Sequence, residues 1–185
     1  MKASIKDITD IRFGFYIQPE EEGNIPYLQV RQFDEEGLLK EESDEYIKLD
    51  KKSEQHLLKD GDVLFVGKGN RLFAWCYREK AGTYVASSIF FVLRPNQKII
   101  YPEYLSAILN APQTKLAFQQ IGGGTNIFSI RKSELGAFEI SLPPMDKQIK
   151  IAAIFELHQK EIALTHHLLT EKHNLYSGII SKLIN

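Results

Sequence analysis

The chain has 185 residues, of which 43% are hydrophobic and 25% are charged, and its formal net charge is −1. This composition is typical of a soluble globular protein, and no apolar run approaches the length of a membrane span. A single cysteine, Cys76, excludes an internal disulfide, so we expect a reducing, cytoplasmic location. The net charge argues against a nucleic-acid binder, but residues 61–155 hold 11 Lys/Arg against 6 Asp/Glu, whereas residues 1–60 hold 9 against 15. The middle of the chain therefore predicts a local basic surface.

The first 95 residues predict a mainly β structure. Short strands are expected at 11–17, 25–30, 63–66, 72–77 and 84–93, and the last of these is the richest in β-branched and aromatic residues. The charge-rich stretch at 33–60 is typical of an irregular, solvated surface.

Helical signals dominate the second half of the chain. Pro102 suits the first position of a helix, which Pro112 is expected to end or kink before it resumes toward Gln120. A glycine-rich loop at 122–126 and a short strand at 138–142 follow. From residue 146 to the end there is no proline, and apolar residues recur every three or four positions. This spacing predicts one long helix.

The apolar stripe of this predicted helix needs a surface to bury it, and a second copy of the same helix is the expected partner. The residues that we expect to pair are Ile154, Ile162, Leu168, Leu175, Ile179 and Leu183. The sequence thus predicts an α+β fold with two parts, a β-rich domain at 1–145 with short helices and a helical arm at 146–185 that dimerises.

Two polar loops are candidates for binding an anionic ligand. The sequence Gly67-Lys68-Gly69-Asn70-Arg71 lies between two predicted strands and places Lys68 and Arg71 at an exposed tip, where both suit phosphates and where Asn70 or Arg71 suits a base edge. The alternative is a plain hairpin turn, and the aromatic residues that follow it are more simply explained as core. In the loop at 122–126, Thr125 and Asn126 offer polar side chains beside several backbone N–H groups. A flexible connection is the alternative here.

The signals for catalysis are weak. Asp50 and Lys52 match half of a nuclease site but have no obvious partner carboxylate, and the four histidines of the arm lack the i, i+4 spacing of a helical metal site. The loop at 67–71 fits neither a P-loop nor a dinucleotide fingerprint. We therefore expect no catalytic residue, no metal and no cofactor.

The order of these segments resembles the specificity subunit of type I restriction–modification systems. The resemblance rests on LLKDGDVLFVGKGNR (57–71), VASSIFFVLRP (85–95), YPEYLSAILNAP (101–112) and GGGTNIFSIRKSELGAFEISLPPMDKQIKIAAIF (122–155), with GNIPYLQVRQF (23–33) as a weaker match. It implies a target recognition domain that grips DNA, followed by a helix that sets the distance between two such domains. Typical members of this family carry two domains and two helices, whereas this sequence has one of each. It is either a half-subunit that dimerises or one half of a larger subunit.

With this resemblance, we expect a non-catalytic module that binds double-stranded DNA and directs a partner adenine methyltransferase and a restriction translocase to a bipartite target. Lys68, Arg71 and Arg31 are expected to neutralise phosphates, and Asn70, Thr125 and Asn126 to contact bases or sugars. The alternative is a protein-interaction module that does not bind DNA and assembles through a helical bundle.

Overall fold

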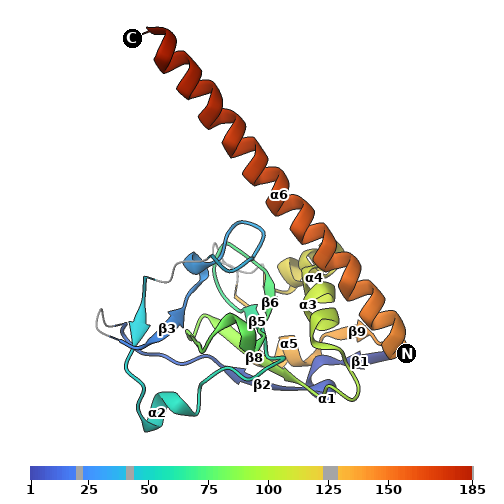
Figure 1. Cartoon of the computed structure of the whole chain (residues 1–185). Helices are drawn as coiled ribbons and strands as arrows, with labels where there is room; N and C mark the ends of the chain where they lie inside the picture. Colours follow the sequence, from blue (N-terminus) through green and yellow to red (C-terminus); the bar gives the residue numbers. More distant parts are fainter. Residues whose placement is uncertain (20–22, 41–43, 123–128, 185) are drawn as a thin grey trace.

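A four-stranded sheet forms the centre of the protein, and one long helix, α6, projects away from it (Figure 1). The computed structural model describes residues 1–19, 23–40, 44–122 and 129–184. The N-terminus lies at the base of α6, and the C-terminus lies at its far end. The predicted α+β fold, with its terminal helical arm, is confirmed. Below, the part of the chain before α6 is called the head, and α6 is called the arm.

The two middle strands of the central sheet are buried on both faces. The strands of this sheet are antiparallel and follow the order β2 (Thr9–Phe13), β8 (Phe90–Pro95), β5 (Val63–Val66) and β6 (Ala74–Cys76). Because side chains alternate along a strand, Phe65 and Leu93 pack under helices on one face, while Leu64 and Val92 pack on the other face. Strands covered on both sides are expected to read as continuous apolar runs, as Val63–Val66 does.

Two smaller sheets flank the central one. In the first, β1 (Lys2–Ser4) pairs with β9 (Glu139–Ser141), so the start of the chain joins the end of the head. In the second, β3 (Ile25–Leu28) lies between β4 (Tyr46–Ile47) and β7 (Val85–Ala86), and β3 and β7 are parallel.

The prediction of one strand at 84–93 is wrong. The Phe90 N–H donates to the Ser87 carbonyl at 3.0 Å, and this turn separates β7 from β8. The two halves of the apolar run therefore join different sheets. The strands expected at 25–30 and 72–77 exist but are shorter, as β3 and β6, and the strand expected at 11–17 is both shorter and shifted toward the N-terminus, as β2.

Helices cover the face of the central sheet that contains Phe65. The break at Pro112 is confirmed, because α3 spans Pro102–Asn110 and α4 spans Pro112–Gly122. The Asn110 side chain joins α3 to β6 by accepting the Ala74 N–H at 3.1 Å and donating to the Ala74 carbonyl at 2.7 Å. The remaining short helices are α1 (Ile5–Ile8), η1 (Val30–Gln32), α2 (Lys51–Glu54), η2 (Glu79–Ala81) and α5 (Lys132–Ala137).

The arm is the helix α6, Met145–Ile184, and its 40 residues extend over about 60 Å at 1.5 Å per residue. Gln148 fixes its base to the head and is only 1% exposed. Its side chain accepts the Tyr101 N–H at 2.8 Å and donates to the carbonyls of Ile99 and Pro143 at 3.1 and 2.9 Å. Farther along, His166 Nδ1 lies 3.4 Å from Glu36 Oε1.

The single apolar stripe expected on this helix is instead divided between two faces. Ile151 packs against the core of the head, and Phe155 and Ile162 are also half-buried. The opposite face exposes a row that we call the arm strip. Its members, between 48% and 77% exposed, are Ile154, Leu157, Leu164, Leu168, Leu175, Ile179 and Leu183.

Candidate nucleic-acid interface

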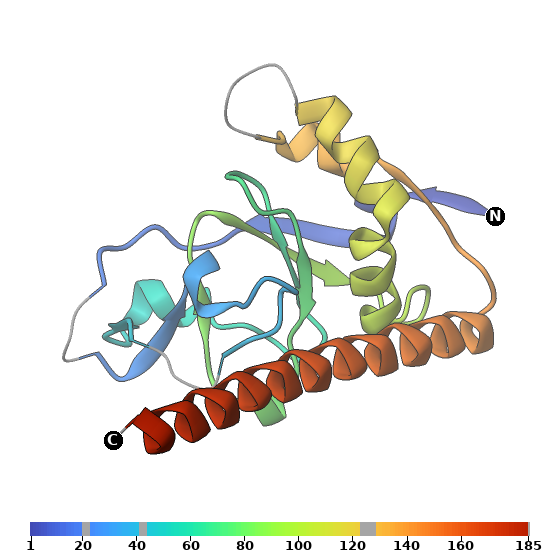
Figure 2. The same ribbon diagram turned by 90° about the horizontal axis from the view of Figure 1, so that it is seen from above.

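The loop at 67–71 and the described segment at 129–132 come together at one edge of the head. Lys68 forms an antiparallel bridge with Ser129, and the Ile130 N–H donates to the Gly67 carbonyl at 3.0 Å. The hairpin between β5 and β6 is thereby joined to the chain that follows the glycine-rich segment. Figure 2 shows this hairpin and α5 on the side of the head away from α6.

Glycine is needed at two positions of the hairpin. A Cβ on Gly67 would lie 2.5 Å from the ring of Phe91, so the backbone can approach the sheet only without a side chain. Gly69 has φ of +122°, a backbone conformation that other residues rarely adopt. Together they bend the hairpin so that Lys68 and Asn70 are both exposed.

Three cations converge at this edge. Lys68 is exposed, and so are Arg131 and Lys132, which lie directly after the bridge at Ser129. Within the described part of the chain, no carboxylate forms an ion pair with any of these three side chains. We call them the basic edge. Cations without a carboxylate partner keep a positive potential that attracts phosphates.

Arg71 is not presented at the loop tip. Its Nη1 donates to the carbonyls of Val30 and Phe33 at 3.3 and 3.1 Å, and its guanidinium carbon lies 5.3 Å from the centre of the Phe73 ring. The side chain thus fastens the hairpin to η1. Whether it also contacts phosphate stays a prediction.

Arg31 lies among acidic groups. Its Nη2 is 2.7 Å from Glu45 Oε1 and 3.3 Å from Asp44 Oδ2, although the side chain remains 55% exposed. These carboxylates reduce the positive potential at this position. Thr125 and Asn126, the other candidates for DNA contacts, lie outside the described residues.

The aromatic residues after the hairpin belong to the core, as the simpler interpretation of the sequence had it. Phe73 and Tyr77 are each 3% exposed, and Trp75 packs beside them in the same cluster. Sequence reasoning missed the basic dipeptide at 131–132. Its position five residues after the glycine-rich loop was a usable signal.

Asp50 has a structural role at the start of α2. Its carboxylate accepts the N–H groups of Lys52 and Ser53 at 2.9 and 2.7 Å, so it caps the helix. The backbone and side-chain hydrogen bonds from Ser53 lower the pKa of Asp50 below its usual value. The cap explains this residue without a nuclease site. Across the described residues, no group of three or more His, Cys, Asp or Glu side chains is placed to hold a metal ion.

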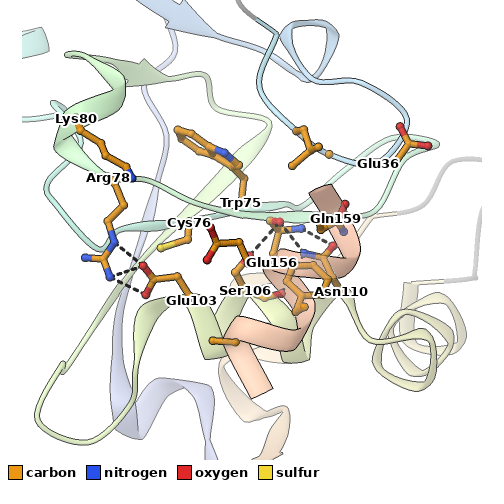
Figure 3. A pocket seen from close by; sticks show the side chains of 15 residues that line it. Glu36, Trp75, Cys76, Arg78, Lys80, Glu103, Ser106, Asn110, Glu156 and Gln159 are labelled. Atoms are coloured by element: carbon orange, nitrogen blue, oxygen red, sulfur yellow. Dashed lines mark hydrogen bonds and ion pairs between the residues drawn. The ribbon is translucent and has the colours of Figure 1, made fainter. Parts of the chain in front are cut away.

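A cavity of about 260 Å³ lies between the head and the arm (Figure 3). Arg78 and Glu103 form a paired hydrogen bond at one end, with both donor–acceptor distances 2.6 Å, Gln159 of the arm lies at the other end, and Glu156 of the arm lies between them. Burial raises the pKa of the Cys76 thiol in its wall to about 12, so the thiol stays protonated and is a poor nucleophile. We assign this cavity to the joint between head and arm.

The expected pairing residues of the arm fall into two groups. Ile154, Leu168, Leu175, Ile179 and Leu183 all lie in the exposed arm strip, whereas Ile162 is half-buried. Sequence reasoning did not include Leu157 and Leu164. Their spacing of seven residues, repeated by Leu168 and Leu175, was the signal for them. Within the described residues, no helix combines the length and apolar character that crossing a membrane requires.

Comparison with known proteins gives the family. The model of the type I restriction modification DNA specificity domain matches residues 1–171. A search of curated proteins gives no match.

Three similar solved structures share this fold. One of them comes from work on the complex assembly and conformational transition of the type I R-M system, and its sequence is 19% identical to this chain. Its TM-score is 0.67, and the match covers 93% of this chain and 41% of that one. The S subunit of a type I restriction-modification system from M. genitalium is 14% identical, with a TM-score of 0.64 and coverage of 92% and 41%. The HsdS subunit from Thermoanaerobacter tengcongensis is 18% identical, with a TM-score of 0.57 and coverage of 91% and 39%. This chain thus spans about two fifths of the length of each of them. By the family match over most of its length, the chain belongs to the type I restriction modification DNA specificity domain family.

Proposed function

We propose that the head binds double-stranded DNA at the basic edge and that the chain is a non-catalytic recognition module. The observation that carries this proposal is the bridge between Lys68 and Ser129, which joins the hairpin chosen for its phosphate-binding chemistry to the segment that carries Arg131 and Lys132. Three exposed cations without a described carboxylate partner surround it. Such an edge suits the phosphates of a duplex, and the exposed side chain of Asn70 beside it suits a base edge.

Within this proposal the residues have different tasks. Lys68, Arg131 and Lys132 contact phosphates, and Asn70 contacts a base or sugar. The same task is proposed for Thr125 and Asn126. Arg71 orders the hairpin first and contacts phosphate only secondarily, because its Nη1 is occupied by two carbonyls. Arg31 makes a weaker phosphate contact beside its two carboxylates.

The arm supplies the second half of the proposal. Two arms pair antiparallel through the arm strip, so two heads address a bipartite target, and the paired helices offer a docking surface to modification methyltransferase subunits. Through that assembly a restriction translocase reaches the same target. In this assembly the chain itself contributes no catalytic group and needs no cofactor.

The arm strip also favours a second function, a protein-interaction module in a helical bundle that binds no DNA. Salt dependence of binding separates the two, because contacts with phosphates release counterions. We expect the wild-type chain to bind a duplex with an affinity that falls steeply with salt concentration.

The direct test compares Lys68→Ala with Lys98→Ala. Lys98 is an exposed lysine in the turn between β8 and α3 and serves as the control. Lys68→Ala should weaken binding to all sequences and lower the salt slope by about one. Fluorescence anisotropy over a range of salt concentrations measures both quantities. Equal behaviour of the two variants would show that the basic edge is not the DNA surface.

A further inference from the structure

An aromatic ring lies exposed beside the basic edge. Phe13 ends β2 on the sheet face that contains Ile11 and Phe91, and it is 55% exposed, whereas Ile11 is 6% exposed. The ring of Phe13 lies 5.1 Å from that of Phe91, centre to centre. Phe91 in turn fills the space beside Gly67. Phe13 is thus coupled by packing to the hairpin that carries Lys68.

One of the cations also contacts this ring. Lys132 Nζ lies 6.0 Å from the centre of the Phe13 ring, at the limit of a cation–π contact. Arg131 precedes Lys132, and Lys68 is bridged to Ser129 two residues before Arg131. Phe13 therefore combines an apolar surface with a position among cations.

Single exposed hydrophobic residues are common and need no explanation by themselves. Phe13 differs because a packed neighbour, Phe91, restricts its ring from one side and a lysine contacts it. Lysines that hold a phosphate backbone would bring base edges to the same place. In the major groove, the apolar feature of a base pair is the 5-methyl group of thymine, and phenylalanine is one of the side chains that contact it.

We propose that Phe13 reads a thymine by contact with its 5-methyl group, while Lys132 holds a neighbouring phosphate. This inference rests on the proposed binding of DNA by the head. It assigns one base-specific contact to a residue at the start of the chain, far in sequence from the loops already considered.

The experiment uses the full chain and deoxyuridine as the probe, since deoxyuridine is thymidine without the methyl group. The preferred half-site is first selected from randomised duplexes, and each thymine in it is then replaced by deoxyuridine. For the wild type, one such replacement should weaken binding about fourfold, which corresponds to about 0.8 kcal/mol for one methyl-sized group. Phe13→Ala should bind the thymine duplex about fourfold more weakly than the wild type does. Replacing that thymine by deoxyuridine should cause no further loss of affinity in this variant.

Two variants control the result. Leu49→Ala removes an apolar side chain of comparable exposure, 43%, from the segment between β4 and α2, and it should leave all affinities unchanged. Lys132→Ala should lower the salt slope by about one and keep the discrimination between thymine and deoxyuridine. A thermal melt shows whether Phe13→Ala disturbs the packing with Phe91. If it does, Lys132→Ala still tests the site.

Three outcomes overturn the inference. They are a half-site without thymine, equal losses for deoxyuridine in wild type and Phe13→Ala, and a uniform loss for Phe13→Ala across all sequences. A wild-type chain that shows no salt-dependent binding to any duplex overturns the proposed function itself. The two failures are therefore distinguishable.

Discussion

Replacing two leucines of the arm strip by aspartate should convert a dimer into a monomer. Leu168 and Leu175 are 55% and 65% exposed and lie on the face of α6 opposite the head. Burying a half-exposed Leu or Ile contributes about 0.75–1.5 kcal/mol, half of the value for a fully exposed side chain. A pair of arms buries two copies of the arm strip, or fourteen side chains, for a gross gain of about 11–21 kcal/mol.

Association costs about 4–15 kcal/mol in lost freedom, so a dissociation constant near 1 μM, about −8 kcal/mol, lies within the expected range. In a twofold pair, Leu168→Asp/Leu175→Asp removes four leucines and thus about 3–6 kcal/mol. This weakens association by a factor of about 10²–10⁴. The two carboxylates on each arm oppose the pairing further.

Sedimentation equilibrium at tens of micromolar is the assay, and Thr170→Asp/Ser177→Asp is the matched control. These two residues are exposed and continue the helix face of His166 rather than the arm strip. The control adds the same charge to the same helix and should remain dimeric. A monomeric wild type would refute self-association through the arm. The remaining interpretation would then be that the chain is one half of a larger subunit. Dissociation of the control to the same extent would refute the assignment of the pairing face.

Two further predictions concern the stability of the head. Arg71→Ala should lower the free energy of unfolding by about 2–3 kcal/mol, because two hydrogen bonds from a charged donor and the stacking on Phe73 are lost. Chemical denaturation measures this free energy directly. An unchanged free energy of unfolding with weakened DNA binding would instead make Arg71 a phosphate contact. Burial, and secondarily the charge of Arg12, lowers the pKa of His56, whose ring stacks on Phe15 at 4.5 Å. His56 therefore binds a proton more readily in the unfolded state than in the folded state. The free energy of unfolding should be at its full value above a pH of about 6.5 and should decrease as the pH falls below it. His56→Phe should abolish this part of the pH dependence in thermal melts, and an identical pH profile for the variant would contradict the assignment.

Local signals predicted the three longest helices of this protein well. Pro102 and Pro112 act through their own backbone geometry, so the bounds of α3 and α4 follow from their positions in the sequence. The long arm follows from an uninterrupted apolar period. The division of its stripe into two faces does not, because Ile151 and Ile154 are equally apolar and only the position of the head distinguishes them.

Contacts between segments far apart in the sequence explain why the strand at 84–93 and part of the site were predicted wrongly. The run at 84–93 divides because Val85–Ala86 pairs with β3, a partner that no local pattern specifies. Arg71 lies in a loop whose composition suits phosphate binding, yet two carbonyls near η1 engage its guanidinium. The contact of Lys132 with Phe13 joins the two ends of the head. A loop can be found by composition, but the residues beside it depend on the fold.

The two faces of the arm connect the fold to the proposed bipartite target. The head occupies one face of α6 through Gln148 and Ala152, and the arm strip lies on the other face, so a second arm can pack without displacing the head. The hydrogen bonds of Gln148 hold the base of the arm in one direction relative to the head. An antiparallel pair would then place the heads at opposite ends, related by a twofold axis. Each basic edge would meet the same half-site in opposite orientation, so a homodimer should prefer inverted repeats, whereas a larger subunit with two different heads should not.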